Sequence, residues 1–277
     1  MQHTEARFKA SDGLELYYQA WRPEGEPKAI LAIVHGYGEH SGRYLNVANY
    51  FVPRGYALYA YDLRGHGRSS GQRGHINRFA EYLADTDTFL KLVHQREPGG
   101  RVFLVGHSLG GLIGAAYAID HPSECPKLIL SSAFFRLKMK VPGWKMALGQ
   151  MLSSLTPGFT MANDIPANIL SHDPAVAVAY DSDPLNHHVA TARFSTEFVV
   201  AQAHTLDRAG EFKTPVLVLY ASQDQLSDPE GSTLFFNRAK VADKTLRRYE
   251  GYYHEIFNEV EKQAVFQDIE VWLASHA

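Results

Sequence analysis

A serine in a glycine-rich turn is the first feature of the sequence that could do chemistry. The segment Gly106–Gly111 reads Gly-His-Ser-Leu-Gly-Gly and places Ser108 in a Gly-x-Ser-x-Gly pattern. This pattern is weak alone, but here it follows an apolar run at 102–105 and opens a helical pattern. A sharp strand–turn–helix connection strains the serine backbone, and the glycines remove Cβ atoms that would collide across the turn. We therefore predict that Ser108 is a nucleophile; an inert serine in a glycine-rich turn is the alternative.

A serine hydroxyl is a poor nucleophile at neutral pH and needs a base, which a histidine oriented by a carboxylate can supply. When such a turn carries the serine, the acid and then the histidine follow it in the chain. Asp224 lies in the loop that follows the apolar run 216–220, and His254 lies in the loop after the run 245–249. We expect His254 to take the proton of Ser108 and later to protonate the leaving alcohol.

Asp228 is a rival for the role of Asp224. It immediately precedes Pro229 and a helical stretch. Aspartate at the N-cap followed by proline at the first helical position is typical of a helix start. We therefore assign Asp228 to capping and keep Asp224 in the predicted triad.

Acyl transfer at a serine also needs N–H donors for the oxyanion of the tetrahedral intermediate. One predicted donor is the backbone N–H of Leu109, next to the serine. The second is expected from the turn His35-Gly36-Tyr37-Gly38, from the N–H of Tyr37. A tight glycine turn without a catalytic role is the alternative for this segment.

These residues fall at the ends of short apolar runs that read as buried strands. The runs are 29–34, 56–61, 102–105, 128–130, 216–220 and 245–249. Helical patterns, such as 79–93 and the last stretch through Leu273, separate them. Strands alternating with helices predict the α/β class, with a mainly parallel central sheet covered by helices on both faces and an antiparallel hairpin from the start of the chain at its edge.

The alternation stops between Phe134 and Phe212. We predict an α/β core formed by residues 1–133 and 212–277, with a helical cap inserted at 134–211. Its helix candidate, 144–155, carries an apolar stripe formed by Trp144, Leu148, Met151, Leu152 and Leu155. The stripe fits packing onto the core, and equally an acyl-chain tunnel or a face that touches bilayers.

Composition narrows the classes of partner and compartment. The 277 residues carry a net charge of −3 without a long basic run, so no nucleic-acid partner is expected. Cys125 is the single cysteine, the start of the chain does not resemble a signal peptide, and no apolar run is long enough to span a membrane. We expect a cytoplasmic enzyme. His172, His187 and His188 lack the spacing of a metal site, so a metal enzyme is a weak option and no cofactor is expected.

Taken together, four segments resemble the monoacylglycerol lipase and lysophospholipase family. They are His35–Tyr44, Asp62–Gly71, Gly106–Gly111 and Tyr253–Glu255, and the resemblance extends over nearly the whole chain. The most specific is Gly-Glu-His-Ser-Gly-Arg-Tyr, which follows the His-Gly turn. The resemblance implies the α/β-hydrolase fold and an enzyme, cytosolic or peripheral at membranes, that cleaves one fatty acyl ester from a glycerol-type head.

The same resemblance implies residues that hold the glycerol end of the substrate. The matching positions are Glu39, Arg43 and His107, with Tyr180 reaching the pocket from the cap. A structural ion pair is the equal alternative for Glu39 and Arg43, and packing behind the turn is the alternative for His107. Tyr37 departs from the family pattern, which often has a smaller residue there, and would narrow the alcohol side of the site.

The predicted function is a serine carboxylic ester hydrolase that converts monoacylglycerols to fatty acid and glycerol through an acyl-enzyme. A lysophospholipase, a general carboxylesterase or an acyltransferase of the same fold is the alternative. Ser108 argues against epoxide hydrolase and dehalogenase chemistry, which need a carboxylate nucleophile. A complete triad argues against a non-catalytic binding module on this fold.

Overall fold

The central sheet has eight strands, and a computed structural model describes it within residues 1–138, 143–163 and 165–276. The strand order is β1-β2-β4-β3-β5-β6-β9-β10. The first two strands form an antiparallel hairpin at one edge, and the strands from β4 onward run parallel. Their bounds are β1 Gln2–Lys9, β2 Glu15–Arg22, β3 Ile30–Val34, β4 Ala57–Tyr61, β5 Val102–His107, β6 Lys127–Ser131, β9 Val216–Ala221 and β10 Lys244–Tyr249. The predicted α/β class, the edge hairpin and a strand at each of the six runs are confirmed. The prediction that all six are buried is wrong for 245–249, because β10 is an edge strand in which only Tyr249 is buried.

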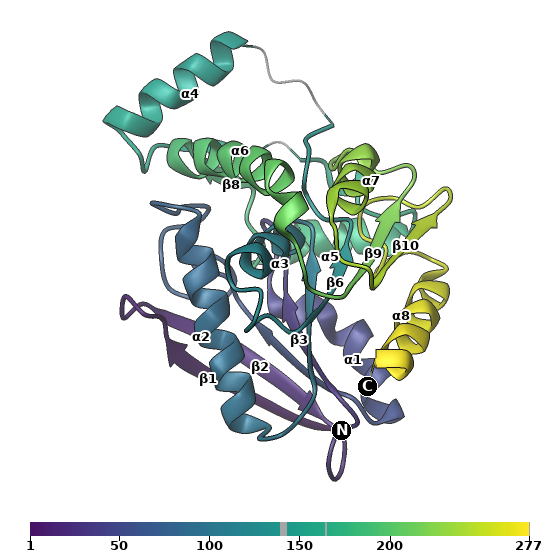
Figure 1. Cartoon of the computed structure of the whole chain (residues 1–277). Coiled ribbons are helices and arrows are strands. Elements are labelled where there is room, and N and C mark those ends of the chain that lie inside the picture. The colour runs from purple at the N-terminus through teal and green to yellow at the C-terminus, as the bar shows by residue number, and fades with distance from the viewer. Residues whose placement is uncertain (139–142, 164, 277) are drawn as a thin grey trace.

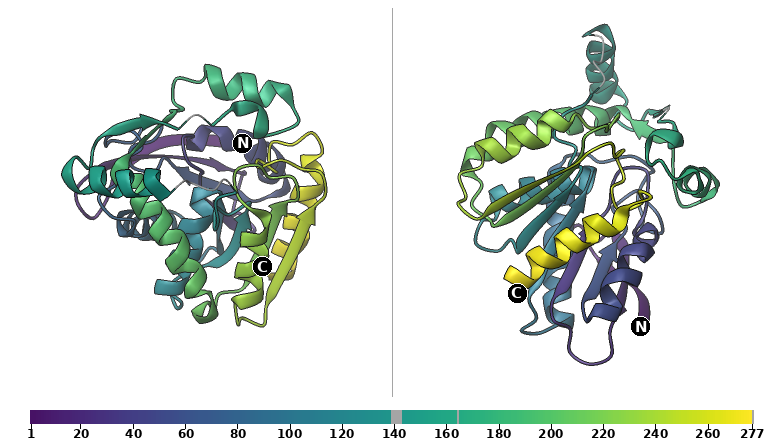
Figure 2. Two further views of the ribbon diagram at one scale, coloured as in Figure 1. Left: turned by 90° about the horizontal axis from the view of Figure 1, so that it is seen from above. Right: turned by 90° about the vertical axis from the view of Figure 1, so that its right-hand side faces the viewer.

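Helices cover both faces of this sheet (Figures 1 and 2). One face packs against α2, α3 and α7, and the other against α1 and α8. The bounds are α1 Leu45–Phe51, α2 Ala80–Arg96, α3 Leu109–Asp120, α7 Pro229–Arg238 and α8 Lys262–His276. The helices predicted from apolar periodicity near residues 79–93 and at the end of the chain are therefore α2 and α8.

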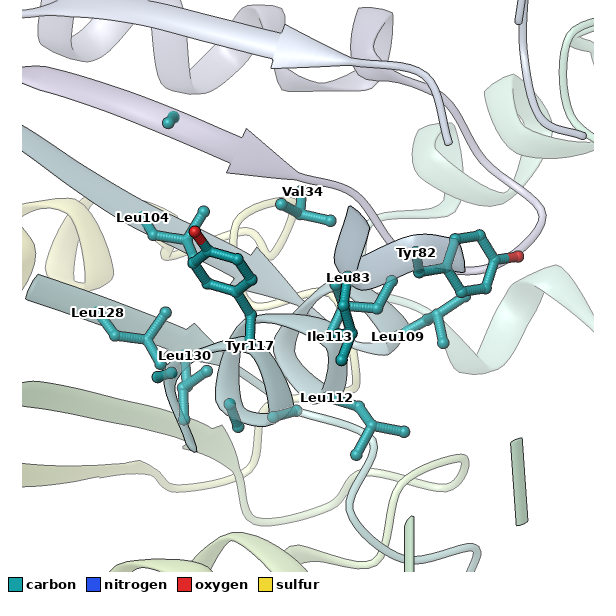
Figure 3. Close-up of a cluster of buried hydrophobic side chains, with 14 of the residues drawn as sticks. Val34, Tyr82, Leu83, Leu104, Leu109, Leu112, Ile113, Tyr117, Leu128 and Leu130 are labelled. Atoms are coloured by element: carbon teal, nitrogen blue, oxygen red, sulfur yellow. The ribbon is translucent and has the colours of Figure 1, made fainter. Parts of the chain in front are cut away.

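The strand β3 shows why the sheet is buried on both sides. Ile30, Ala32 and Val34 belong to the apolar cluster on one face, and Leu31 and Ile33 to the cluster on the other. Successive side chains of a strand alternate between faces, so a run that is apolar throughout needs helices on both. In the close-up of Figure 3, side chains of α3 lie against those of β5 and β6. This packing holds α3 against β5 and β6, and it thereby positions the turn between β5 and α3 that contains Ser108.

Between β6 and β9, none of the residues that the structure describes adds a strand to the central sheet. It contains α4 Gly143–Leu155, α5 Pro174–Ser182 and α6 Ala192–Asp207, with a small antiparallel sheet of β7 Thr160–Ala162 and β8 Val189–Thr191. In Figure 1, α4, α6 and β8 lie above the central sheet, and α4 projects farthest. The helix expected at 144–155 is α4. The division of the chain into a core and a cap at 134–211 stays a prediction.

The apolar stripe of α4 does not pack onto the central sheet. Leu148, Met151 and Leu155 expose 43%, 51% and 73% of their surface. The side chain of Trp144, which belongs to the predicted stripe, lies outside the described residues. No helix in the described ranges has both the length and the apolar character needed to cross a bilayer.

Candidate active site

Ser108 lies in a strained turn between β5 and α3. Its backbone has φ 54° and ψ −116°, in the left-handed half of conformational space that non-glycine residues rarely adopt. A Cβ on Gly106 would collide with the carbonyl of Gly110, and a Cβ on Gly110 would collide with the carbonyl of Val34. The Ser108 N–H donates to the carbonyl of Ser131 on the neighbouring strand over 2.9 Å, which holds the turn in place.

Ser108, His254 and Asp224 form one hydrogen-bonded chain. His254 Nε2 lies 2.8 Å from Ser108 Oγ, and His254 Nδ1 lies 2.6 Å from Asp224 Oδ2. Ser108 follows β5, Asp224 follows β9 and His254 follows β10, so three distant segments meet at the carboxyl ends of parallel strands. The side chains are almost closed off from solvent, with 4%, 3% and 2% of the surface of Ser108, His254 and Asp224 exposed.

The carboxylates of Asp224 and Asp228 have different roles. Asp224 Oδ1 accepts hydrogen bonds from the N–H groups of Leu226 and Ser227 over 2.8 and 3.0 Å, which leaves Oδ2 for the histidine. Asp228 is the N-cap of α7 and accepts from the N–H of Glu230. The assignment of Asp228 to capping is therefore confirmed by the contacts of its side chain.

The charge of Asp224 sets the protonation of His254. Burial alone would lower the pKa of His254, but the Asp224 carboxylate and its hydrogen bond outweigh burial and raise that pKa above its ordinary value. His107 behaves in the opposite way. Burial and the neighbouring His254 lower the pKa of His107 to about 4, so this second imidazole is neutral at physiological pH.

The loop after β3 lies against the serine turn. A Cβ built on Gly36 would be 3.2 Å from Ser108 Cβ, so the two backbones approach as closely as a glycine allows. Within the described ranges, the N–H groups of Tyr37 and Leu109 have no protein acceptor. Two free N–H groups beside a serine could bind an oxyanion. The Tyr37 side chain turns toward the cap, where its hydroxyl donates to the Val189 carbonyl.

A buried ion network braces this loop from the other side. Arg43 donates to Glu39 Oε2 over 2.8 Å and, through both terminal nitrogens, to the Glu255 carboxylate over 2.6 and 2.7 Å. Glu39 Oε1 accepts from the N–H of Gly36 over 2.6 Å and from the hydroxyl of Tyr44 over 2.9 Å. The ion-pair alternative for Glu39 and Arg43 is thus present in the structure.

The network surrounds a small recess beside the triad. His107 has its Nδ1 3.1 Å from Ser131 Oγ, and its ring lies 5.1 Å from that of His254. The Tyr180 ring from α5 lies 4.9 Å from the Arg43 guanidinium carbon, so the cap reaches this corner. The recess is lined by Glu39, Arg43, Tyr44, His107, Glu255, Phe257 and Asn258.

The roles of Glu255 and of a row of aromatic residues were missed by the sequence reasoning. Glu255 lies in the segment Tyr253–Glu255, but nothing in that segment indicates that it pairs with Arg43. The ring of Phe134 lies 6.1 Å from that of His254, and Phe198 lies 5.0 Å from Phe134. Phe194 continues the row at 5.6 Å from Phe198. Phenylalanines in a cap carry no pattern that distinguishes a substrate wall from ordinary packing.

Two other segments hold loops and take no part in the chain of contacts at Ser108. The Asp62 carboxylate accepts from the N–H groups of Ser41 and Arg68, and Arg64 pairs with buried Asp85. His172 lies in the predicted cap segment, and its Nδ1 is 2.9 Å from Oε1 of Glu259, in the segment between β10 and α8. Across the described part of the chain, no three His, Cys, Asp or Glu side chains come together as a metal site.

Comparisons with known proteins agree on one family. The profile of the hydrolase family described as serine aminopeptidase, S33, matches residues 25–261. A monoacylglycerol lipase of Mycolicibacterium smegmatis is 34% identical over 99% of this chain and 98% of its own length. A human monoglyceride lipase is 31% identical over 95% of this chain and 88% of its own. The crystal structure of a monoacylglycerol lipase from Paleococcus ferrophilus is 32% identical, with a TM-score of 0.84 over all of both chains.

Proposed function

Since the chain belongs to the serine aminopeptidase S33 family of α/β-hydrolases, we propose that it hydrolyses monoacylglycerols to a fatty acid and glycerol. The chain is a serine ester hydrolase. The observation that carries the proposal is the continuous hydrogen-bonded chain from Ser108 through His254 to Asp224. The names of its relatives support monoacylglycerols as the substrate class.

In the proposed mechanism, His254 removes the proton from Ser108 while Oγ attacks the ester carbonyl. Asp224 holds the ring in the tautomer that leaves Nε2 free to accept. His254 then protonates the glycerol oxygen as the carbon–oxygen bond breaks, which leaves an acyl group on Ser108. Water, deprotonated by the same imidazole, attacks the acyl-enzyme and releases the fatty acid.

We propose the N–H groups of Tyr37 and Leu109 as the oxyanion donors of this mechanism. Leu109 is the first residue of α3, so the positive end of the helix dipole faces the same place. Loss of one such donor would remove about 3 kcal/mol of transition-state stabilisation.

We propose that the glycerol head binds beside the triad, next to this recess, whose own volume of about 10 Å³ has room for no more than one water. His107 lines the recess, Tyr180 lies against Arg43, and the buried pair Glu39 and Arg43 supplies charge there. Hydroxyl groups of glycerol can both donate to a carboxylate and accept from a guanidinium. The aromatic row of Phe134, Phe198 and Phe194 is the proposed wall for the acyl chain, because it begins beside His254 and offers an apolar surface.

The exposed stripe of α4 is the proposed contact with lipid surfaces. Leu148, Met151 and Leu155 lie on one side of the helix, at spacings of three and four residues. Burying such side chains in the interfacial region of a bilayer is favourable, and no membrane span is needed for it. We propose a cytoplasmic enzyme that binds membranes transiently at their surface and takes up its substrate there.

Hydrolysis rates across a series of esters test the substrate assignment. Monoacylglycerols from acetyl to oleoyl, lysophosphatidylcholine, nitrophenyl esters and an alanine nitroanilide would be compared as kcat/KM. We expect the highest value for a medium- or long-chain monoacylglycerol. A preference for acetyl or butyryl esters would favour a general carboxylesterase, a preference for lysophosphatidylcholine a lysophospholipase, and a preference for the anilide an aminopeptidase; each would overturn the proposal.

A further inference from the structure

The Tyr37 side chain joins the loop after β3 to the cap. Its hydroxyl donates to the carbonyl of Val189 in β8 over 2.5 Å. Its ring stacks on that of Phe194, in the first turn of α6, with centroids 4.3 Å apart. Burial raises the pKa of the Tyr37 phenol well above its ordinary value, so the hydroxyl remains a donor at any physiological pH.

Aromatic rings hold the Tyr37 side chain on three sides. Besides Phe194, the imidazoles of His66 and His187 meet it edge to face, each with its centroid 5.3 Å away. His66 belongs to the core and His187 to the cap, so the ring is clamped between the two. A side chain so enclosed cannot change rotamer without displacing the segments that contact it.

Backbone contacts close the same junction on both sides of Tyr37. The N–H of His187 donates to the carbonyl of Gly38 over 3.0 Å, and the N–H of Thr191 donates to the carbonyl of Gly74 over 3.0 Å. Gly74 has no room for a Cβ, which would lie 2.5 Å from the Tyr37 hydroxyl and collide with the Val189 carbonyl. The segment 187–191 is therefore fitted directly onto the loop that carries the Tyr37 N–H.

We propose that the Tyr37 side chain is a positioning residue that couples the seating of the cap to the placement of its own backbone N–H as an oxyanion donor. This inference rests on the proposed function, since it assigns a use to the Tyr37 donor. When segment 187–191 lifts away, the hydroxyl loses its acceptor and the ring loses Phe194. The loop is then free to shift, and the oxyanion site is incomplete until the cap returns.

The coupling has a kinetic signature because the donor acts on the transition state. An interaction made only in the transition state changes kcat, whereas a contact that holds the substrate equally in both states changes KM. A shift of the Tyr37 N–H therefore lowers kcat and weakens the binding of a tetrahedral analogue by the same factor. The KM of a small ester that barely touches the cap stays the same.

The test compares Tyr37→Phe with Tyr59→Phe, using nitrophenyl acetate as the substrate. Both variants lose a tyrosine hydroxyl that donates a hydrogen bond, but Tyr59 donates to Glu97 away from the site. The inhibitor is a trifluoromethyl ketone, to whose carbonyl carbon the serine oxygen adds, leaving an alkoxide for the oxyanion donors. Thermal unfolding of each variant checks that the fold is intact.

We expect Tyr37→Phe to lower kcat about tenfold and to raise the inhibitor Ki by the same factor, with KM changed by less than about twofold. Tyr59→Phe should leave all three values unchanged. An unchanged kcat and Ki in Tyr37→Phe, or a raised KM with an unchanged kcat, would overturn the proposal. Failure of the proposed function would be visible elsewhere: in the ester series, as a preference for another substrate class, or in Ser108→Ala, as retained esterase activity.

A second variant approaches the contact from the cap, in case Tyr37→Phe does not fold. Phe194→Leu keeps Tyr37 and its hydrogen bond but removes the stacked ring. The proposal predicts the same paired fall in kcat and rise in Ki, smaller than in Tyr37→Phe. A change in KM alone would show that Phe194 only contacts substrate, and would contradict the coupling.

Discussion

Two regions of the molecule differ in how their side chains are surrounded. One is the edge of the sheet that carries the proposed triad, and the other is the helix α4. Ser108, Asp224 and His254 are buried, and each is held by hydrogen bonds to backbone or side chains. Helix α4 exposes much of the surface of Leu148, Met151 and Leu155 to solvent. Packing and hydrogen bonding explain the first region completely, whereas the second has an apolar surface that folding alone leaves in water. This difference is why we propose the chemistry for the first region and a lipid contact for the second.

The largest expected effect concerns the acid of the triad. Asp224→Asn keeps the size of the side chain but removes the charge that orients and stabilises protonated His254, so kcat should fall about ten-thousandfold. Steady-state hydrolysis of nitrophenyl butyrate measures it. Asp228→Asn is the matched control, because asparagine caps a helix as well as aspartate does. Equal losses in the two variants would remove Asp224 from the proposed triad.

The buried ion network around Arg43 should contribute far more to the free energy of unfolding than an exposed ion pair does. Arg43→Gln leaves the carboxylates of Glu39 and Glu255 without their partner, and the free energy of unfolding should fall by about 3–5 kcal/mol. The control is Arg7→Gln, which breaks an exposed pair with Glu15 and should cost about 0–1 kcal/mol. Urea unfolding measures both. Similar losses would show that burial does not set the value of the Arg43 network.

Acidification should switch off the reaction through His254. Its pKa is raised, so the imidazole becomes protonated at a higher pH than the ordinary value of 6.5 and can no longer accept the serine proton. We expect kcat/KM to fall about tenfold per pH unit below a midpoint above 6.5. His107, with a pKa of about 4, should add nothing near neutrality. A pH profile with its acid midpoint near 4 would transfer the role of base to His107.

The smallest effect is expected on the cap side. Met151→Ser removes an exposed apolar side chain from α4, and hydrolysis of monooleoylglycerol in phosphatidylcholine vesicles should fall about threefold. Hydrolysis of water-soluble nitrophenyl butyrate should stay the same. Gln150→Ser, at an exposed polar position of the same helix, is the control. Equal loss on both substrates would mean that the stripe acts on the chemistry and not at the lipid surface.

The same two regions differ in what could be predicted from the sequence. Apolar runs identified the six parallel strands, and the loops that follow them contain Ser108, Asp224 and His254 at one edge of the sheet. This worked because the order of strands and turns limits where a loop residue can lie. Two contacts could not be predicted in this way: Arg43 pairs with Glu255, and the Tyr37 hydroxyl donates to the Val189 carbonyl. Both depend on how loops that are distant in the sequence pack together, and no local periodicity encodes that packing. The exposure of the α4 stripe was equally undetermined, since an amphipathic helix can face a core or a bilayer.

The central claim is that Ser108 is the nucleophile activated by His254, and covalent labelling tests it most directly. Purified wild-type protein and Ser108→Ala would be incubated with a fluorophosphonate probe, in which the serine oxygen displaces fluoride at phosphorus, and the labelled site would be read by mass spectrometry. The account predicts one labelled residue, Ser108, in the wild type, and no labelling of Ser108→Ala. Labelling of another residue, equal labelling of both proteins, or none of either would contradict it.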